Sequence, residues 1–433
     1  MSQGLVGVRK AARENKEMRF TSLLHHVSVD LLRASFHSLK RKAAPGVDGV
    51  TWQEYESGLE GRLTDLHSRV HRGAYRAQPS RRVYIEKEDG RKRPLGVAAL
   101  EDKIVQQAVV AVLNQIYEED FLGFSYGFRP GRSQHQALDA LTYALMKKKV
   151  NYVLDADIQG FFDNLDKSWL IKFVEHRVAD PRILRLIRKW LNAGVMEEGQ
   201  WSDTRTGTPQ GSVLSPLLSN LVLDELDHEL ERRGHRYVRY ADDCNIYVRS
   251  ERAGHRAMTS ITRFITQRLK LKVNEAKSAV ARAQERKFLG FSFTSDPEIR
   301  RAIAPKALTR FKDKIREITR QAKGISIETT VKRLATYMVG WRGYFGFCET
   351  PEVLIGLIRW VRLRLRCAFW RQWKTPRRRR AALLQLGVRP RLAANTAGSG
   401  RGPWYLARSK ALSVGASNAY FRSLGLPSLF ENY

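Results

Sequence analysis

Cysteine is scarce in this chain. Its 433 residues include three cysteines, Cys244, Cys348 and Cys367, and no two of them have CxxC spacing. This number is too small for a disulfide framework, and the spacing predicts no zinc site. Three unpaired cysteines are typical of a reducing compartment, so we expect a cytoplasmic protein.

Long apolar runs are also missing. The N-terminal segment has no apolar core of the kind found in export signals. Charges interrupt even the most apolar helical stretch, residues 353–373, and this excludes a membrane span there. No internal repeat is visible, and no membrane partner is expected.

Acidic residues are few relative to basic ones. The chain has 44 Asp and Glu against 76 Lys and Arg, a net charge of +32. A net +21 of this excess lies between residues 301 and 433. Such an imbalance predicts strong, salt-sensitive binding to phosphates, and we interpret the last third as a nucleic-acid-binding platform.

Two adjacent carboxylates stand out among the few acids. Asp242 and Asp243 lie between two β-prone runs, Tyr237-Val238 and Ile246-Tyr247-Val248, which predicts a hairpin with both aspartates at its tip. Neighbouring negative charges repel unless a cation neutralises them, and hard oxygen ligands favour Mg²⁺ or Mn²⁺. The alternative is ordinary turn chemistry, in which aspartate is common.

A third carboxylate follows an upstream strand. Residues 152–158 are typical of a short buried strand, and Asp155 and Asp157 share one of its faces. Asp157 at a strand end, beside the hairpin, would complete a site for two metal ions about 3.5–4 Å apart. The alternative for Asp157 is a turn or helix-capping role, and we expect Asp155 to be structural.

An ordered series of motifs covers nearly the whole chain and resembles the reverse transcriptases encoded by bacterial group II introns, also called maturases. The matching segments are Lys42–Thr51, Arg82–Lys87, Arg93–Gly96, Gly127–Ser133, Asp157–Asp163, Gly207–Pro216, Tyr240–Asp243, Lys272–Ser278 and Phe288–Phe291.

This resemblance implies an α+β fold with the right-hand polymerase architecture. It implies an N-terminal extension and start of the fingers in 1–80, and fingers and palm with antiparallel sheet in 81–295. A helical thumb in 296–375 and a basic nucleic-acid-binding region in 376–433 would follow.

The family also implies roles at the metal site. Asp157, Asp242, Asp243 and the Ile158 carbonyl would hold two Mg²⁺ ions, with Mn²⁺ as a substitute. Lys277 would face the nucleotide or the metals, although exposed lysines are common.

Four further residues would bind the nucleotide. Lys87 and Arg93 would reach the triphosphate, with Asp89-Gly90 forming the turn between them, although without the family a solvated basic hairpin face would be preferred. Gln210 would lie near the incoming base and sugar. Phe162 would clash with a ribose 2′-hydroxyl, the alternative being a core phenylalanine like its neighbour Phe161.

The C-terminal third carries candidate nucleic-acid contacts. Residues 353–373 predict a helix on which Arg359, Arg362 and Arg366 form one basic stripe that could follow a duplex backbone, unless they are arginines of a packed helix. The run Arg377, Arg378, Arg379 and Arg380 is interpreted as an RNA-phosphate patch or a linker. Residues 393–402 are expected to be a flexible connection.

The expected function is that of an RNA-directed DNA polymerase that binds its group II intron RNA, assists splicing and makes cDNA for intron mobility. Its partners would be intron RNA, an RNA template with a DNA primer, target DNA and dNTPs. The chain resembles the short form that lacks a zinc-dependent endonuclease. Two alternatives remain: a domesticated reverse transcriptase in repair or phage defence, and an RNA-binding splicing cofactor without synthesis.

Overall fold

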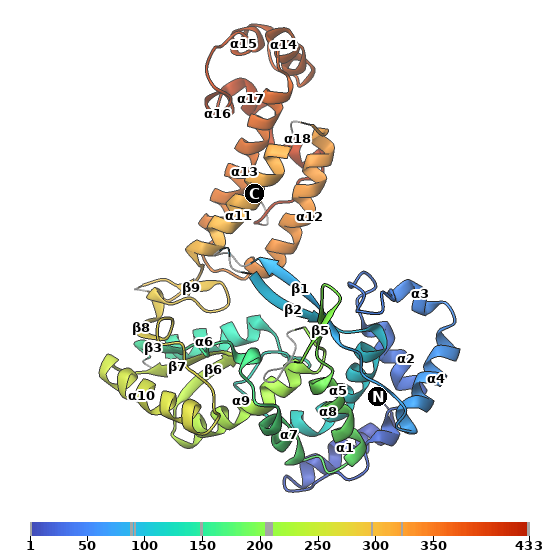
Figure 1. The fold of residues 1–433 in the computed structure, drawn as a ribbon. Helices are drawn as coiled ribbons and strands as arrows, with labels where there is room; N and C mark the ends of the chain where they lie inside the picture. Colours follow the sequence, from blue (N-terminus) through green and yellow to red (C-terminus); the bar gives the residue numbers. More distant parts are fainter. Residues whose placement is uncertain are drawn as a thin grey trace. The chain divides into compact units, whose positions relative to one another are not determined.

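A computed structural model describes residues 2–86, 90, 92–147, 150–203, 211–295, 298–321 and 324–430, apart from the side chain of Asp163. Lys87 and Gln210 lie outside the described residues. The fold is mixed α+β, as the sequence predicts, with antiparallel strand pairs and many helices (Figure 1). Contacts divide the chain into two compact units, Met1–Arg282 and Ala283–Tyr433. The finer four-part division stays a prediction.

The first unit is built around one long buried helix. This helix, α5 (Leu100–Asp120), is apolar on most of its circumference, so it needs neighbours on several sides. Helices α1 and α2 pack directly on it, and α4 packs on both α2 and α3. The N-terminal elements are α1 (Gln3–Glu14), a 3-10 turn (Leu24–His26), α2 (Val29–Ser38), α3 (Trp52–Glu56) and α4 (Leu59–His71).

A four-stranded sheet stands beside these helices. Its strands are β1 (Ser80–Glu86), β2 (Lys92–Val97), β4 (Val195–Glu197) and β5 (Gln200–Ser202), in the order β2-β1-β4-β5. Strands β1 and β2 form the expected antiparallel hairpin, in which Ile85 pairs with Arg93. Asp89 of the predicted turn lies outside the described residues.

Asp102, in the first turn of α5, joins this helix to the chain that enters β1. The Tyr75 hydroxyl donates a hydrogen bond to one carboxylate oxygen, and the Gln78 amide donates to the other at 3.0 Å. Burial raises the pKa of Asp102 to about 6, although these two hydrogen bonds oppose the rise.

This shift predicts a specific pH dependence of stability. The pKa in the folded state lies above the ordinary value of 3.8, so the folded state binds the extra proton between about pH 4 and pH 6. The contribution of Asp102 to the free energy of unfolding should therefore fall as the pH rises through this window. In urea titrations at several pH values, Asp102→Asn should remove this fall, whereas the exposed control Glu231→Gln should keep it. An unchanged pH profile in Asp102→Asn would contradict the assignment.

The first unit contains a second four-stranded sheet, in which every strand pair is antiparallel. Its strands are β6 (Arg236–Tyr240), β7 (Asp243–Val248), β3 (Tyr152–Ala156) and β8 (Ala279–Arg282), in the order β6-β7-β3-β8. Leu154, Ala156, Cys244 and Ile246 face the main hydrophobic core. Helix α10 (Glu251–Gln267) contacts β3, β7 and β8, and α6 (Gln134–Lys147) contacts β6. The remaining helices of the unit are a 3-10 turn (Phe161–Asp163), α7 (Lys167–Glu175), α8 (Pro181–Asn192) and α9 (Ser215–Arg232).

The second unit is mainly helical. It begins with a 3-10 turn (Ala283–Glu285) and the pair β9 (Phe291–Phe293) and β10 (Arg301–Ile303). Its helices are α11 (Pro305–Gln321), α12 (Ile327–Phe345), α13 (Pro351–Gln372), α14 (Pro376–Gln385), α15 (Pro390–Ala397), α16 (Pro403–Leu406), α17 (Lys410–Gly415) and α18 (Asn418–Ser423). Helix α13 confirms the helix predicted for 353–373. Figure 1 shows α14 to α17 gathered around one end of α13.

The sequence interpretation of residues 393–402 is wrong in its first half. Pro390 begins α15, which continues to Ala397, and Ala393 belongs to a small core with Leu383 and Leu412. The connection that remains is 398–402. No described helix of the chain is both long and apolar enough to cross a membrane.

Candidate active site

Asp242 and Asp243 lie at the tip of the hairpin between β6 and β7, as predicted. Tyr240 pairs with Asp243, which leaves Ala241 and Asp242 as a two-residue turn. Ala241 has a φ of +56°, a left-handed conformation that is uncommon for any residue with a Cβ. Asp242 is exposed, whereas Asp243 is half-buried and accepts a hydrogen bond of 3.3 Å from the buried Asn245 side chain.

A buried ion pair stabilises this turn. Arg239 and Asp227, both fully buried, form a two-point ion pair with distances of 2.8 and 2.5 Å. Arg239 also donates to the carbonyl of Ala241 and to the Asn220 side chain, each at 3.0 Å. The pKa of Arg239, which burial alone would lower, is raised by the charge of Asp227. A fixed guanidinium therefore holds the turn carbonyl in place.

The glycine of the Gly127–Ser133 motif packs against the same turn. A Cβ on Gly127 would lie 2.1 Å from the amide nitrogen of Ala241, so only glycine fits there. Its carbonyl accepts a hydrogen bond of 2.8 Å from Asn220. Arg129 of this motif is buried, pairs with Glu118 and donates to the carbonyl of Ser125, which gives it a structural role.

Asp157 is positioned by the segment that follows α10. The Ser278 hydroxyl accepts a hydrogen bond from the Asp157 amide at 3.0 Å, and the Asn274 amide donates to the Asp157 carbonyl at 2.7 Å. Lys277 brings its ammonium within 3.8 Å of the Asp157 carboxylate. Asp157 does not cap the next helix, α7, because the side chain of Asp166 is the cap of that helix.

The register of β3 and β7 brings the acidic residues together. Ala156 pairs with Cys244 in the antiparallel ladder, so the next position on each strand places Asp157 opposite Asp243. Side chains at opposed positions share one face of a sheet. The carboxylates at 157 and 243 therefore occupy the same face, beside the turn that carries Asp242.

The Ile158 carbonyl is oriented by the same backbone. The bridge between Ile158 and Val273 is made by the carbonyl of Asp157 and the amide of Gln159. Because successive carbonyls of a strand alternate in direction, the Ile158 oxygen is directed away from this bridge, toward the β7 side.

These donors fit divalent ions by their chemistry. Carboxylate and carbonyl oxygens are ligands of Mg²⁺ and Mn²⁺. In the part of the chain that the structure describes, no group of three or more His, Cys, Asp or Glu residues forms a ready-made metal cage. Mg²⁺ sites at phosphates need no such cage, because substrate oxygens complete the coordination of one or two carboxylates.

The predicted nucleotide-binding residues come from several elements. Arg93 lies on β2, one strand of the hairpin expected to hold the triphosphate. Gly211, which follows Gln210, has a φ of +105°, and a Cβ there would lie 3.0 Å from the carbonyl oxygen of Gly96 on the same strand. The chain after Gln210 therefore runs close to the strand that carries Arg93. Lys87 and Gln210 themselves lie outside the described residues.

Phe161 and Phe162 have different environments. Phe161 is 3% exposed and belongs to the core, as expected. Phe162 is half-buried in the 3-10 turn after Asp157, with its ring edge-on to that of Phe161 at 5.2 Å. A contact between Phe162 and the sugar stays a prediction.

The arginines of α13 do not form one exposed stripe. Arg359 is exposed, but Arg362 is 4% exposed, and Arg366 is half-buried and donates to the carbonyl of Ala416 at 3.0 Å. The expected basic face is therefore interrupted, because neighbouring parts of the second unit cover it. The run Arg377–Arg380 is the first part of helix α14 and not a linker.

Sequence reasoning missed the residues that hold the turn, namely Arg239, Asp227 and Asn220. The sequence signal for the ion pair is a charged side chain, Arg239, in an otherwise β-prone strand, together with an acidic side chain, Asp227, in an apolar helix. Burial of either charge costs free energy unless the two charges form an ion pair. Their meeting depends on how α9 packs on β6, which no local pattern contains.

Two family models match the chain. The family described as "Reverse transcriptase (RNA-dependent DNA polymerase)" matches residues 85–293, and "Group II intron, maturase-specific domain" matches residues 308–386. The first match contains every predicted metal and nucleotide residue, and the second contains the candidate arginines of α13 and α14.

Curated relatives agree with these matches. The chain is 33% identical to "Protein YkfC" of Escherichia coli (strain K12), over 63% of this chain and 80% of that protein. It is 29% identical to "Group II intron-encoded protein LtrA" of Lactococcus lactis subsp. cremoris, over 66% of this chain. The "Putative COX1/OXI3 intron 1 protein" of Saccharomyces cerevisiae is 25% identical over 75% of this chain. The chain spans 58% and 45% of the lengths of these last two proteins.

Solved structures give a weaker likeness. A chain of "Partial Cas6-RT-Cas1--Cas2 complex" matches with a TM-score of 0.35 and 23% identity, over 57% of this chain and 43% of that chain.

Proposed function

We propose that this chain, which belongs to the reverse transcriptases with a group II intron maturase-specific domain, copies RNA into DNA and binds group II intron RNA. The observation that supports synthesis most directly is the β3–β7 register: Ala156 pairs with Cys244, so Asp157 directly follows this pair on one strand and Asp243 directly precedes it on the other, beside the turn that carries Asp242. A protein that only binds RNA has no need for three carboxylates in that arrangement.

In this proposal the acidic residues hold two divalent ions. Asp157 and Asp242 would hold both ions, with Asp243 beside them, and the Ile158 carbonyl would add a backbone oxygen. When bound, Mg²⁺ supplies Lewis-acid chemistry that favours attack of the primer 3′-hydroxyl on the α-phosphate. Lys277, 3.8 Å from Asp157, compensates part of the local negative charge and faces the nucleotide.

The β1–β2 hairpin and the segment after β5 bind the incoming dNTP. Arg93 and Lys87 contact the triphosphate as cations, and Gln210 lies beside the base and sugar. The approach of Gly211 to β2 supports this grouping, because it brings the two segments together.

Phe162 selects the deoxyribose by steric exclusion. In Phe162→Ala, single-nucleotide incorporation assays should show ribonucleotide use relative to deoxynucleotide use rising about tenfold or more, since the ring that opposes the 2′-hydroxyl is gone. Phe162→Tyr keeps the ring in place and should keep the discrimination. A Phe162→Ala enzyme with wild-type sugar selectivity would show that the residue is only a packing group.

The second unit supplies the RNA-binding part. Residues 301–433 carry a net +21, and the maturase-specific match lies within them. We assign to this unit the binding of intron RNA during splicing, and the binding of target DNA during mobility. The finer division into fingers and palm, thumb and basic terminal region, and a cytoplasmic location, are part of the same proposal.

Two paired assays test the function. Primer extension on RNA and DNA templates tests synthesis, and a splicing assay on the transcript that flanks the gene tests the maturase role. Failure to copy RNA with either Mg²⁺ or Mn²⁺ would contradict the polymerase assignment. Synthesis without a folded intron RNA around the gene would instead favour the domesticated alternative.

A further inference from the structure

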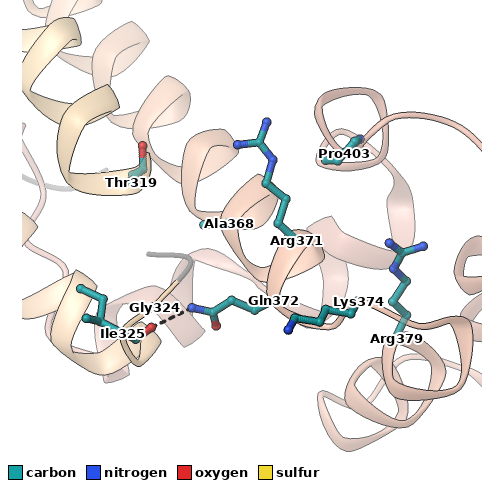
Figure 2. Close-up of a pocket in the computed structure, with 9 residues that line it drawn as sticks. All are labelled: Thr319, Gly324, Ile325, Ala368, Arg371, Gln372, Lys374, Arg379 and Pro403. Carbon is teal, nitrogen blue, oxygen red and sulfur yellow. Dashed lines mark hydrogen bonds between the residues drawn. The ribbon is translucent and has the colours of Figure 1, made fainter. Parts of the chain in front are cut away.

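The second unit contains a cavity of about 1030 Å³ near the C-terminal end of α13. Its described lining residues come from the end of α11 and the segment before α12, the end of α13 and the connection that follows it, α14 and the start of α16, and Figure 2 shows them: Thr319, Gly324, Ile325, Ala368, Arg371, Gln372, Lys374, Arg379 and Pro403. Gln372 is tied to the Ile325 carbonyl by a hydrogen bond of 2.9 Å, which joins two of these walls.

The walls of this cavity are cationic. Arg371, Lys374 and Arg379 line it, and none of its described lining residues is Asp or Glu. A fourth cation lies behind Thr319, whose hydroxyl accepts a hydrogen bond of 3.0 Å from Arg364. Burial lowers the pKa of Arg364, and the charges of Arg371 and other nearby arginines lower it further. Several positive charges therefore lie close together at this cavity. They repel one another, and a bound anion would reduce this repulsion.

Lys374 occupies a position where its backbone is strained. Its φ of +33° lies in the left-handed region, directly after the end of α13, where glycine is the usual residue. A residue other than glycine at such a strained position indicates that its side chain has a function. Figure 2 places Lys374 between Gln372 and Arg379 along the chain that borders the cavity.

Arg379 differs from the other arginines of its run. It is half-buried, lines the cavity and packs over the ring of Trp370 at 4.6 Å, so its guanidinium has a fixed place. Arg377, Arg378 and Arg380 are exposed. The structure therefore separates one member of the run from the rest.

Helix α16, which contributes the lining residue Pro403, carries two exposed aromatic residues. Trp404 and Tyr405 directly follow the lining residue Pro403, and their side chains are 37% and 56% exposed. Arg408 lies over Trp404 and Arg401 over Tyr405. Cations beside exposed aromatic rings are typical of surfaces that bind single-stranded nucleic acid, because bases stack on the rings and phosphates meet the cations.

We propose that this cavity is a phosphate-binding site for an unpaired segment of RNA, with Arg371, Lys374 and Arg379 contacting phosphates and Trp404 and Tyr405 stacking the adjoining bases. The inference rests on the proposed binding of intron RNA, and it names the part of the second unit that takes an unpaired strand. The three cations lie within the maturase-specific match, which favours RNA as the occupant.

The test compares two triple variants of the full chain. The cavity variant carries Arg371→Gln, Lys374→Gly and Arg379→Gln, and the control carries Arg377→Gln, Arg378→Gln and Arg380→Gln, which removes the same charge. Binding of a single-stranded RNA oligonucleotide, a duplex RNA and a single-stranded DNA is titrated across a range of salt concentrations. The cavity variant should reduce the salt slope for single-stranded RNA by about 2, since each lost phosphate contact lowers it by about 0.7. The control should change it less.

Two single variants keep the proposal testable if the triple variant folds poorly. Lys374→Gly relieves the backbone strain, so its melting temperature should equal or exceed that of the wild type while single-stranded RNA binding weakens. Trp404→Ala should weaken binding of the single strand about tenfold and leave duplex binding unchanged.

The outcomes separate this inference from the proposed function. A wild-type protein that binds no RNA would overturn both. Wild-type binding with equal effects of the cavity and control variants would overturn the cavity assignment alone. A larger loss for duplex RNA or for single-stranded DNA than for single-stranded RNA would overturn the assignment of an unpaired RNA as the occupant.

Discussion

Asp242→Ala should abolish primer extension while leaving affinity for RNA nearly intact. Asp242 is exposed at a two-residue turn, so its carboxylate is available to divalent ions and substrate phosphates. Loss of a carboxylate that holds the ions removes several kcal/mol of charge stabilisation, which corresponds to about a thousandfold or greater fall in rate. Single-turnover primer extension on an RNA template measures this loss.

Stability and binding provide the controls for this variant. Because the Asp242 side chain is exposed, its removal should leave the unfolding transition nearly unchanged. The exposed control Glu231→Gln, on the helix before the hairpin, should extend the primer at the wild-type rate. If Asp242→Ala extended a primer at the wild-type rate, the assignment of the catalytic carboxylates would be wrong.

Local patterns predicted the elements of the active site well. Alternating β-prone residues around two aspartates predicted the β6–β7 hairpin, and the run before Asp157 predicted β3. Both depend on side chains close in sequence, which share a strand face or a turn. The placement of Asp157 beside the hairpin rested on the chemistry of a two-metal site, and the pairing of β3 with β7 was not predicted, since no local pattern specifies which strands become neighbours.

The same spacing argument fails where another element covers a face. Arg359, Arg362 and Arg366 do lie on one helix, as predicted, yet Arg362 is buried and Arg366 bonds to the Ala416 carbonyl. Helical periodicity specifies relative directions along a helix but not which direction faces solvent. A cationic residue among apolar neighbours can equally be a buried, hydrogen-bonded one.

Composition misled the interpretation of residues 393–402 for a related reason. Ala, Asn, Gly and Ser together are typical of flexible connections. Pro390 at the first position of α15 is, however, a helix-start signal, and the small residues let α15 pack closely on α14 and α17. A helix that packs closely through small side chains therefore has the same composition as a flexible loop.

The buried pair beneath the turn provides the prediction with the second large effect. Arg239→Met leaves Asp227 charged, buried and without its cation, so the free energy of unfolding should fall by about 3–5 kcal/mol. The double variant Arg239→Met with Asp227→Leu removes both charges from the core, and its stability should recover most of this loss, because apolar side chains of similar volume can replace a buried ion pair. Urea denaturation measures both values.

Synthesis should not recover with stability in the double variant. Arg239 donates to the Ala241 carbonyl at 3.0 Å and holds a turn whose φ of +56° is unfavourable for alanine. Without that donor the turn relaxes, and Asp242 and Asp243 lose their fixed relation to Asp157. We therefore expect kcat to stay at least tenfold below the wild type while the KM for dNTP changes little, since the nucleotide-binding residues lie on other elements. A stable double variant with wild-type kcat would show that Arg239 supports only the fold, whereas a stable but slow one identifies it as a positioning residue for the carboxylates.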